Sequence, residues 1–155
     1  MKKLFLLFGM FLVAVLYVSA QDYVITGAGT GKSGHYLVSV KVNVKKTKMK
    51  NEDLVMQAAV DGVMFRGFMT TDGAVDQKPI VTDPGIRTTK SDFFDLFNAN
   101  GEYRRYASVV PGTLTMMKNK QLKCIEVSAN VLVDQQQLIK YLESSGVIAG
   151  FSNLW

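Results

Sequence analysis

Apolar and polar residues alternate in two stretches of the chain, residues 35–46 and 122–134. A period of two with β-branched residues on one side predicts strands with one buried face. The apolar positions are Tyr36, Val38, Val40, Val42 and Val44, and then Ile125, Val127, Ala129, Val131 and Val133. The opposite positions are Ser39, Lys41 and Asn43, and then Glu126, Ser128, Asn130 and Asp134 with Cys124 and Leu132. Two such strands predict a sheet that is covered on one face and open to solvent on the other.

The spacing of apolar residues also predicts three helices, each bounded by residues typical of helix ends. Side chains that cap helix N-termini stand at the three starts, namely Asn51, Ser91 and Asp134. Glycines stand at the three ends, namely Gly67, Gly101 and Gly146. The first helix, from Leu54 to about Arg66, has alanine and glycine on its inner face, which predicts a close approach to the sheet.

The remaining segments complete the predicted fold. Thr113–Met117 and the stretch from Leu122 predict a hairpin, and Tyr103–Val110 predicts another strand. Met69–Lys90 is a loop of about twenty residues, and loops of that length in a compact domain are usually functional or mobile. Val147–Trp155 is expected to add an edge strand or to pack against the core. The order of elements predicts an α+β fold, a two-layer sandwich with helices packed on one face of a mainly antiparallel sheet.

The N-terminus has the layout of a cleavable secretory signal over residues 1–20. Lys2 and Lys3 precede an apolar run of about fifteen residues, shorter than the roughly 20 that a membrane-spanning helix needs. An uncleaved anchor is the alternative. Cleavage is predicted between Ala20 and Gln21, which would place the mature protein in the periplasm or outside the cell. Residues 21–34 are then a flexible glycine-rich leader, and residues 35–155 a single α+β domain without a transmembrane segment.

Charge narrows the choice of partners. Without Lys2 and Lys3, the basic side chains fall from 18 to 16 against 13 acids, so the net charge is +3 rather than +5. This balance gives no reason to expect a nucleic acid. The densest charge cluster, Lys41, Lys45, Lys46, Lys48 and Lys50, is expected to be a solvated strand end that discourages aggregation. The alternative is contact with an anionic surface such as lipopolysaccharide, or with an acidic partner.

The string "TGAGTGKSG", residues 26–34, resembles the phosphate-binding loop of a nucleotide hydrolase. That loop needs a glycine where Thr26 stands, and a helix after the Lys-Ser pair, so that the backbone N–H groups and the helix dipole meet the phosphates. Here Gly34 is followed by a strand pattern. We therefore expect Gly27–Gly34 to be poorly ordered and to hold no phosphate, and nucleotide binding through this degenerate stretch is only a third hypothesis.

Catalytic chemistry has few candidate residues. His35 is the single histidine, so a small hydrolase would have to use His35 with a carboxylate. Ser33 is near it in sequence, but "GKSGH" is not a nucleophile elbow. With one histidine and one cysteine, a zinc site is unsupported, and no cofactor is expected. Cys124 cannot form an intrachain disulfide and is expected to be a small core residue, with a free thiol or an intermolecular link as alternatives.

Several segments resemble small, uncharacterised exported proteins of Gram-negative bacteria, and the resemblance covers most of the chain after residue 20. It rests on the N-terminal signal and on "AAVDGVMFRGF", "FFDLF" with "GEYRRY", and "VSANVLVDQQQLIKYLESSGVI". It implies export but no activity and no site residues.

The leading functional hypothesis is an exported, non-enzymatic binding domain for a protein or another envelope component. Its oligomeric state is not predicted. The candidate contact residues lie on the polar sheet face and in the long loop, and are Lys41, Asn43, Glu126, Ser128, Asn130, Asp83 and Arg87.

Overall fold

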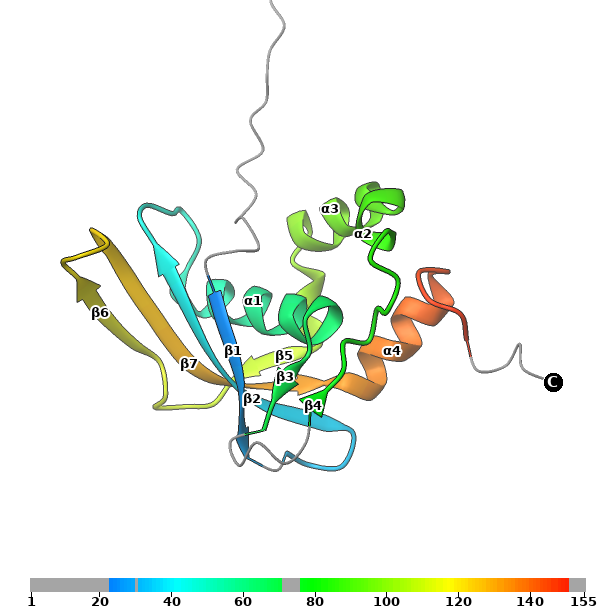
Figure 1. Cartoon of the computed structure of the whole chain (residues 1–155), viewed down its shortest axis with the longest axis horizontal. Helices are drawn as coiled ribbons and strands as arrows, with labels where there is room; N and C mark the ends of the chain where they lie inside the picture. The colour runs from blue at the N-terminus through cyan, green and yellow to red at the C-terminus, as the bar shows by residue number, and fades with distance from the viewer. Residues whose placement is uncertain (1–22, 30, 71–75, 151–155) are drawn as a thin grey trace, which may run out of the picture.

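The computed structural model describes residues 23–29, 31–70 and 76–150 (Figure 1). The strands are β1 (Tyr23–Gly29), β2 (His35–Val44), β3 (Phe68–Met69), β4 (Asp76–Gln77), β5 (Ala107–Val109), β6 (Thr115–Asn119) and β7 (Cys124–Asp134). The helices are α1 (Asn51–Phe65), α2 (Ile86–Thr89), α3 (Ser91–Ala99), the 3-10 helix η1 (Glu102–Arg105) and α4 (Gln135–Ser144). The predicted α+β class is confirmed.

One antiparallel sheet organises the molecule. Its strand order is β1-β2-β7-β5, and β6 also pairs with β7. β2 and β7 form the centre over ten residue pairs, from His35 opposite Asp134 to Val44 opposite Ile125. β5 and β6 pair with different parts of β7, residues 131–133 and 124–128, on the edge that β2 leaves free. The hairpin predicted between β6 and β7 is therefore confirmed.

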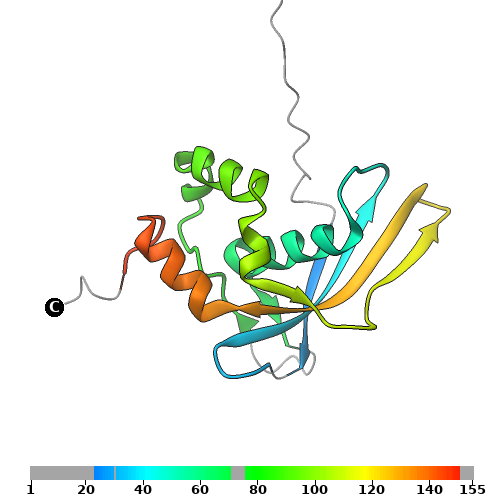
Figure 2. The ribbon, with the colours of Figure 1, turned by 180° about the vertical axis from the view of Figure 1, so that it is seen from behind.

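The helices cover one face of this sheet, as Figures 1 and 2 show from opposite sides. α1 contacts β1, β2, β5 and β7, and its inner face is fully buried at Val55, Ala59 and Val63. The sheet contributes the alternating valines that the sequence pattern predicts, with Val38, Val40, Val131 and Val133 inaccessible to solvent. Each of these side chains removes apolar surface from water, so the layer interface is the main source of stability.

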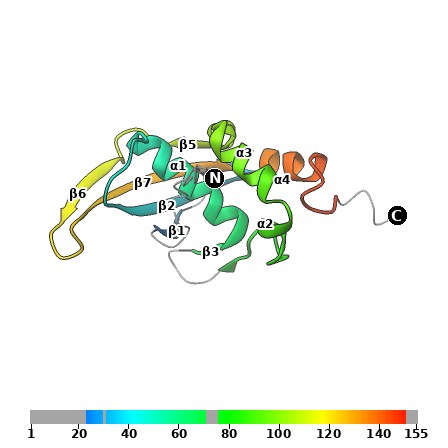
Figure 3. The ribbon, with the colours of Figure 1, turned by 90° about the horizontal axis from the view of Figure 1, so that it is seen from above.

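A second part of the core joins the elements beyond α1. Phe93 and Phe97 of α3 contact Tyr106 and Tyr141. The ring centroids lie 5.5–6.2 Å apart in the contacting pairs, which are Phe93–Phe97, Phe97–Tyr106, Phe93–Tyr141, Phe97–Tyr141 and Tyr106–Tyr141. Figure 3 shows α3 and α4 lying next to each other beyond the end of α1. Because α4 continues directly from β7, these aromatic contacts fix it against the helical layer.

The N-terminal segment departs from the prediction of a flexible leader at residues 21–34. β1 is an edge strand that pairs with β2, from Tyr23 opposite Val42 to Gly29 opposite Leu37. Tyr23 is only 5% exposed. Ile25 packs directly against Gly62 of α1, where a larger residue would leave no room for its side chain. The alternation of Tyr23, Ile25 and Gly27 is too short, and too rich in glycine, to be distinguished from a linker in the sequence. Glycine here permits close packing rather than mobility.

The helix ends agree with the prediction at the glycines but not at every cap. Gly67, Gly101 and Gly146 adopt left-handed backbone conformations with φ near +70°, as the helix stops require. The Asp134 carboxylate accepts a hydrogen bond from the Gln137 N–H at 3.0 Å and caps α4. Asn51 and Ser91, by contrast, are the first helical residues of α1 and α3, and the preceding lysines make no capping bond through their side chains.

The long loop predicted at Met69–Lys90 contains regular structure. β3 and β4 form a two-stranded sheet, and α2 adds one helical turn, while residues 71–75 lie outside the described part. The backbone N–H groups of Ile80 and Val81 donate to carbonyl groups at the end of α1, which anchors the segment to the helical layer. The strand predicted at Tyr103–Val110 is also shorter, because η1 occupies its first residues.

The predicted domain boundaries lie close to the two ends of the chain. Residues 1–22, which include the predicted signal and its cleavage site, and residues 151–155 of the predicted tail lie outside the described residues. Val147, at the start of that tail, is buried in the core. In the described ranges, no helix combines the length and the apolar character needed to cross a membrane.

Candidate functional site

The sheet face opposite the helices carries most of the predicted contact residues. β2 and β7 place Ser39 opposite Asn130, Lys41 opposite Ser128, and Asn43 opposite Glu126. We call these six side chains the outer face. The strand period of two puts all six on one side because Val38, Val40 and Val42 take the buried side. The described helices α1, α2 and α3 lie on the other side of the sheet, as the two side views show (Figures 1 and 2).

The outer face is polar and partly organised by its own contacts. Lys41 Nζ lies 3.9 Å from Glu126 Oε1, a distance that makes a weak, solvated ion pair. Ser128 Oγ lies 2.8 Å from Thr115 Oγ1 of β6, so each hydroxyl has a partner. Lys41 remains more than half exposed, and the other five side chains are half-buried. These groups offer donors, acceptors and one cation to a bound surface.

The structure does not bring Asp83 and Arg87 to the outer face. Asp83 is a turn residue before α2, and its carboxylate accepts a hydrogen bond from the Gly85 N–H. Arg87 forms an ion pair with Asp61 of α1, in the helical layer. The predicted site is therefore two separate surfaces, since the sequence could not show that residues 69–90 fold back onto α1.

Arg87 belongs to a network that connects β1, α1 and α2. Asp61 binds Arg87 and also accepts a hydrogen bond of 2.5 Å from the Tyr23 hydroxyl. The Arg66 guanidinium lies 4.0 Å from the centre of the Tyr23 ring and donates to the Tyr23 carbonyl. Burial raises the pKa of the Tyr23 hydroxyl and lowers the pKa of Arg87. These contacts give Arg87 a structural role.

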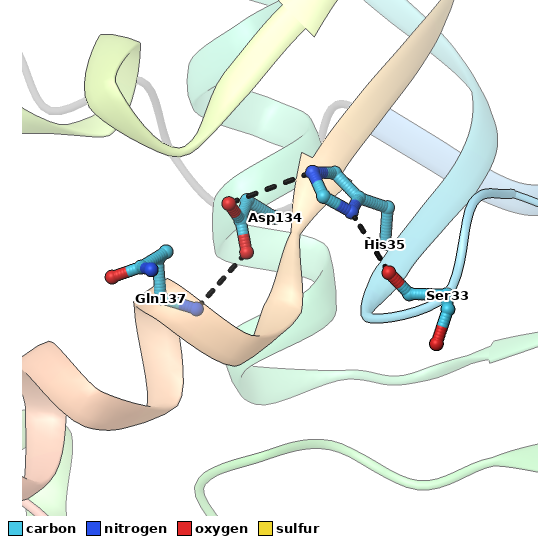
Figure 4. A network of polar contacts seen from close by, with 4 residues as sticks. All are labelled: Ser33, His35, Asp134 and Gln137. Atoms are coloured by element: carbon cyan, nitrogen blue, oxygen red, sulfur yellow. Dashed lines mark hydrogen bonds and ion pairs between the residues drawn. The ribbon is translucent and has the colours of Figure 1, made fainter.

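The single histidine does have a carboxylate beside it. His35 Nε2 lies 3.5 Å from Asp134 Oδ2, and the two residues face each other across β2 and β7 (Figure 4). Asp134 also caps α4 through its other oxygen, and His35 Nδ1 lies 3.3 Å from the Ser33 carbonyl. The Ser33 hydroxyl points away from the imidazole in Figure 4. The arrangement is a cross-strand pair at a helix start, and among the described residues no nucleophile forms a hydrogen bond with His35.

The phosphate-loop string has the wrong structural context for a nucleotide. Gly27 and Gly29 belong to β1, and residues 32–35 form a turn in which the His35 N–H donates to the Lys32 carbonyl. A strand follows this turn in the sequence, where a phosphate-binding loop requires a helix. The helix start nearest the turn is that of α4, and its Gln136 N–H already donates to the Gly34 carbonyl. The expected poor order of Gly27–Gly34 is therefore wrong for the strand residues, because their backbone pairs with β2.

Two open hollows are features that sequence reasoning missed. The first, of about 320 Å³, lies at the β6–β7 hairpin and is lined by Met117, Lys118, Asn119, Lys120, Gln121 and Glu126. The second, of about 420 Å³, lies between α1 and β5, and its lining includes Met56, Arg104 and Val109. Arg104 binds Asp53 through two hydrogen bonds and holds the pKa of that carboxyl below its usual value. The second hollow depends on contacts between distant segments, whereas the first lies within one hairpin.

Metal and cofactor chemistry has little support among these residues. Within the described ranges, no three His, Cys, Asp or Glu side chains come together as a metal site. Cys124 is a buried free thiol at the start of β7, but it lies outside the main hydrophobic cluster, and its Sγ is 3.8 Å from Asn43 Oδ1. Comparison of the chain with family models, with curated proteins and with solved structures finds no match.

Proposed function

We propose that the protein is an exported, non-enzymatic binding domain that contacts a protein or another envelope component through the outer face. The observation that carries this proposal is the register of β2 and β7, which aligns polar side chains on the sheet face opposite α1, α2 and α3. A flat polar surface with several donors and acceptors is suited to a macromolecular partner. The secretory pattern at residues 1–20 supports export.

The polar contacts of His35 favour binding over hydrolysis. Its carboxylate partner is already engaged at the start of α4, and its other nitrogen faces a backbone carbonyl. A hydrolase of this kind needs a nucleophile within hydrogen-bond reach of the base. The described contacts of His35 include no such hydroxyl or thiol. The pair of His35 and Asp134 instead connects β2 to the start of α4, which is a structural role.

Position-specific photocrosslinking in the producing cells tests the proposal. A photoreactive residue at Lys41, in the centre of the outer face, should give one discrete adduct. The same residue at Lys140, exposed on α4, is the matched control and should give none. Ser39→Arg, next to Lys41 on the outer face, should reduce the adduct at least about tenfold because the bulky cation blocks close contact. Gln136→Arg should leave it unchanged.

Equal adducts from Lys41 and Lys140, or no adduct from Lys41, would contradict the proposal. N-terminal sequencing of the accumulated protein checks the export component in the same preparation. The expected first residue is Gln21, and an intact Met1 in the envelope fraction would instead indicate an uncleaved anchor.

A further inference from the structure

Two lysine-rich segments that are far apart in sequence meet at one end of the sheet. The β2–α1 loop begins where Val44 lies opposite Ile125, and the β6–β7 turn lies beside it. Figures 1 and 2 show both segments at the same end, from opposite sides of the molecule. The Asn51 amide also contacts the Met116 sulfur, which links the start of α1 to β6.

This end is strongly cationic. It carries seven exposed lysines, and neither residues 44–51 nor residues 116–125 contain an acid. The lysines are Lys45, Lys46, Lys48, Lys50, Lys118, Lys120 and Lys123. The rest of the chain from residue 21 has nine basic and thirteen acidic side chains, a net charge of −4. The positive field is therefore concentrated at one end instead of being spread over the surface.

Large apolar side chains are exposed among these lysines. Met116 and Met117 on β6 are 60% and 64% exposed, Leu122 in the turn is 57% exposed, and Ile125 is 42% exposed. The register places Met116 and Ile125 on the side of the hairpin that faces the helices and Met117 on the side of Glu126, so exposed apolar side chains occur on both faces of the hairpin. We call the seven lysines and these four apolar residues the basic end.

We propose that the basic end docks on a bilayer surface that carries anionic phospholipid headgroups. The lysines would lie at the phosphate level, and the methionines and Leu122 at the boundary between headgroups and acyl chains. Charge complementarity identifies the surface, and the exposed apolar residues favour a lipid over a purely ionic partner. The basic end has no aromatic side chains, which stacking on nucleic acid bases would use.

The inference does not rest on the proposed function, since the basic end and the outer face share no residue. If the tip of the β6–β7 hairpin enters the headgroup region, the strands of the sheet run away from the membrane surface. The outer face would then remain accessible to a partner. The two proposals can therefore fail separately.

Vesicle co-sedimentation tests the charge component, with the protein as it is isolated from producing cells. Binding to phosphatidylcholine vesicles containing phosphatidylglycerol should exceed binding to phosphatidylcholine alone by at least about tenfold and should weaken as salt is added. The triple variant Lys118→Gln/Lys120→Gln/Lys123→Gln should lose at least about tenfold in this binding. Lys78→Gln/Lys90→Gln/Lys140→Gln removes the same charge from exposed sites elsewhere and should bind as the wild type.

A second pair of variants tests the apolar component. Met117→Ser/Leu122→Ser should weaken binding by about tenfold, while Met69→Ser/Leu96→Ser, at positions of similar exposure, should not. Any N-terminal segment that the isolated protein retains is the same in all variants. Differences in vesicle binding between a variant and its control therefore come from the basic end. Equal effects of the two charge variants, or no preference for anionic vesicles, would overturn the proposal. Loss of binding in the lysine triple variant with no effect of Met117→Ser/Leu122→Ser would indicate attachment by charge alone and would overturn the placement of the methionines and Leu122 at the acyl-chain boundary.

Discussion

Glycines with the same backbone conformation have different surroundings in this protein. Gly67 and Gly146 both follow helices, with φ of +69° and +68°. A Cβ atom at Gly67 would lie 2.1 Å from the Gln77 carbonyl oxygen, whereas at Gly146 it would meet nothing within 4 Å. The first glycine is required by both backbone conformation and space, and the second by conformation alone.

These two sites give a matched prediction for stability. Gly146→Ala should lower the free energy of unfolding by about 1 kcal/mol, the usual cost of a left-handed alanine. Gly67→Ala should lower it by at least about 3 kcal/mol, because the backbone of β4 must also move. Denaturant unfolding with unchanged slope measures both values. Equal losses at the two sites would show that β4 does not pack against Gly67.

At the scale of elements, the contact between β1 and α1 determines whether the N-terminal strand belongs to the domain. Gly62 lies on the inner face of α1, and a Cβ atom there would approach Ile25 Cδ1 to 2.7 Å and Tyr23 Cε2 to 3.3 Å. Glycine lowers helix propensity by about 1 kcal/mol relative to alanine, but its absence of a side chain lets β1 pack closely. The packing of β1 explains a helix-weakening residue in the last turn of α1.

A double-mutant cycle measures this contact. Gly62→Ala alone should destabilise the protein by about 1 kcal/mol, since overpacking outweighs the gain in helix propensity. In the Ile25→Val background, which lacks Cδ1, the same change should cost less, and the coupling free energy should be at least about 0.5 kcal/mol. Additive effects would mean that residues 23–29 behave as the flexible leader that the sequence suggests.

On the scale of the whole molecule, buried phenols connect stability to alkaline pH. Burial raises the pKa of Tyr23, Tyr36, Tyr103 and Tyr106. These tyrosines lie on β1, on β2, in η1 and just after η1. The folded protein holds the phenolic protons more tightly than the unfolded chain does. Their stabilising effect is therefore fully present below the ordinary tyrosine pKa of about 10 and is lost as pH rises above it.

The free energy of unfolding should accordingly fall steeply above about pH 10. Tyr23→Phe should make that fall shallower, because one buried phenol no longer ionises on unfolding. It should also lower stability at neutral pH, because the hydrogen bond to Asp61 is lost. Phenolate absorbance, recorded together with circular dichroism, should show ionisation and unfolding occurring together. Full tyrosine ionisation in a folded protein would contradict this expectation.

Much of the fold followed from short-range patterns in the sequence. The alternation in residues 35–44 and 124–134 predicted which side of β2 and β7 is buried, because side chains on a strand point alternately to opposite faces. The three glycine stops followed for a similar reason, since only glycine adopts their conformation at low cost. The same pattern identified the polar side chains of the outer face.

Only the tertiary structure decided which distant segments meet. It turned the glycine-rich residues 23–29 into an edge strand, separated Asp83 and Arg87 from the outer face, and brought Lys45 next to the β6–β7 hairpin. Local periodicity cannot encode such contacts, because they depend on strand order and on how loops fold back over the sheet. The sequence alone determined which side of the central strands faces the core, although it was wrong at the start of β7, where Ile125 is exposed and Cys124 is buried. The tertiary structure determined how far the helices cover that side and which exposed residues share a surface.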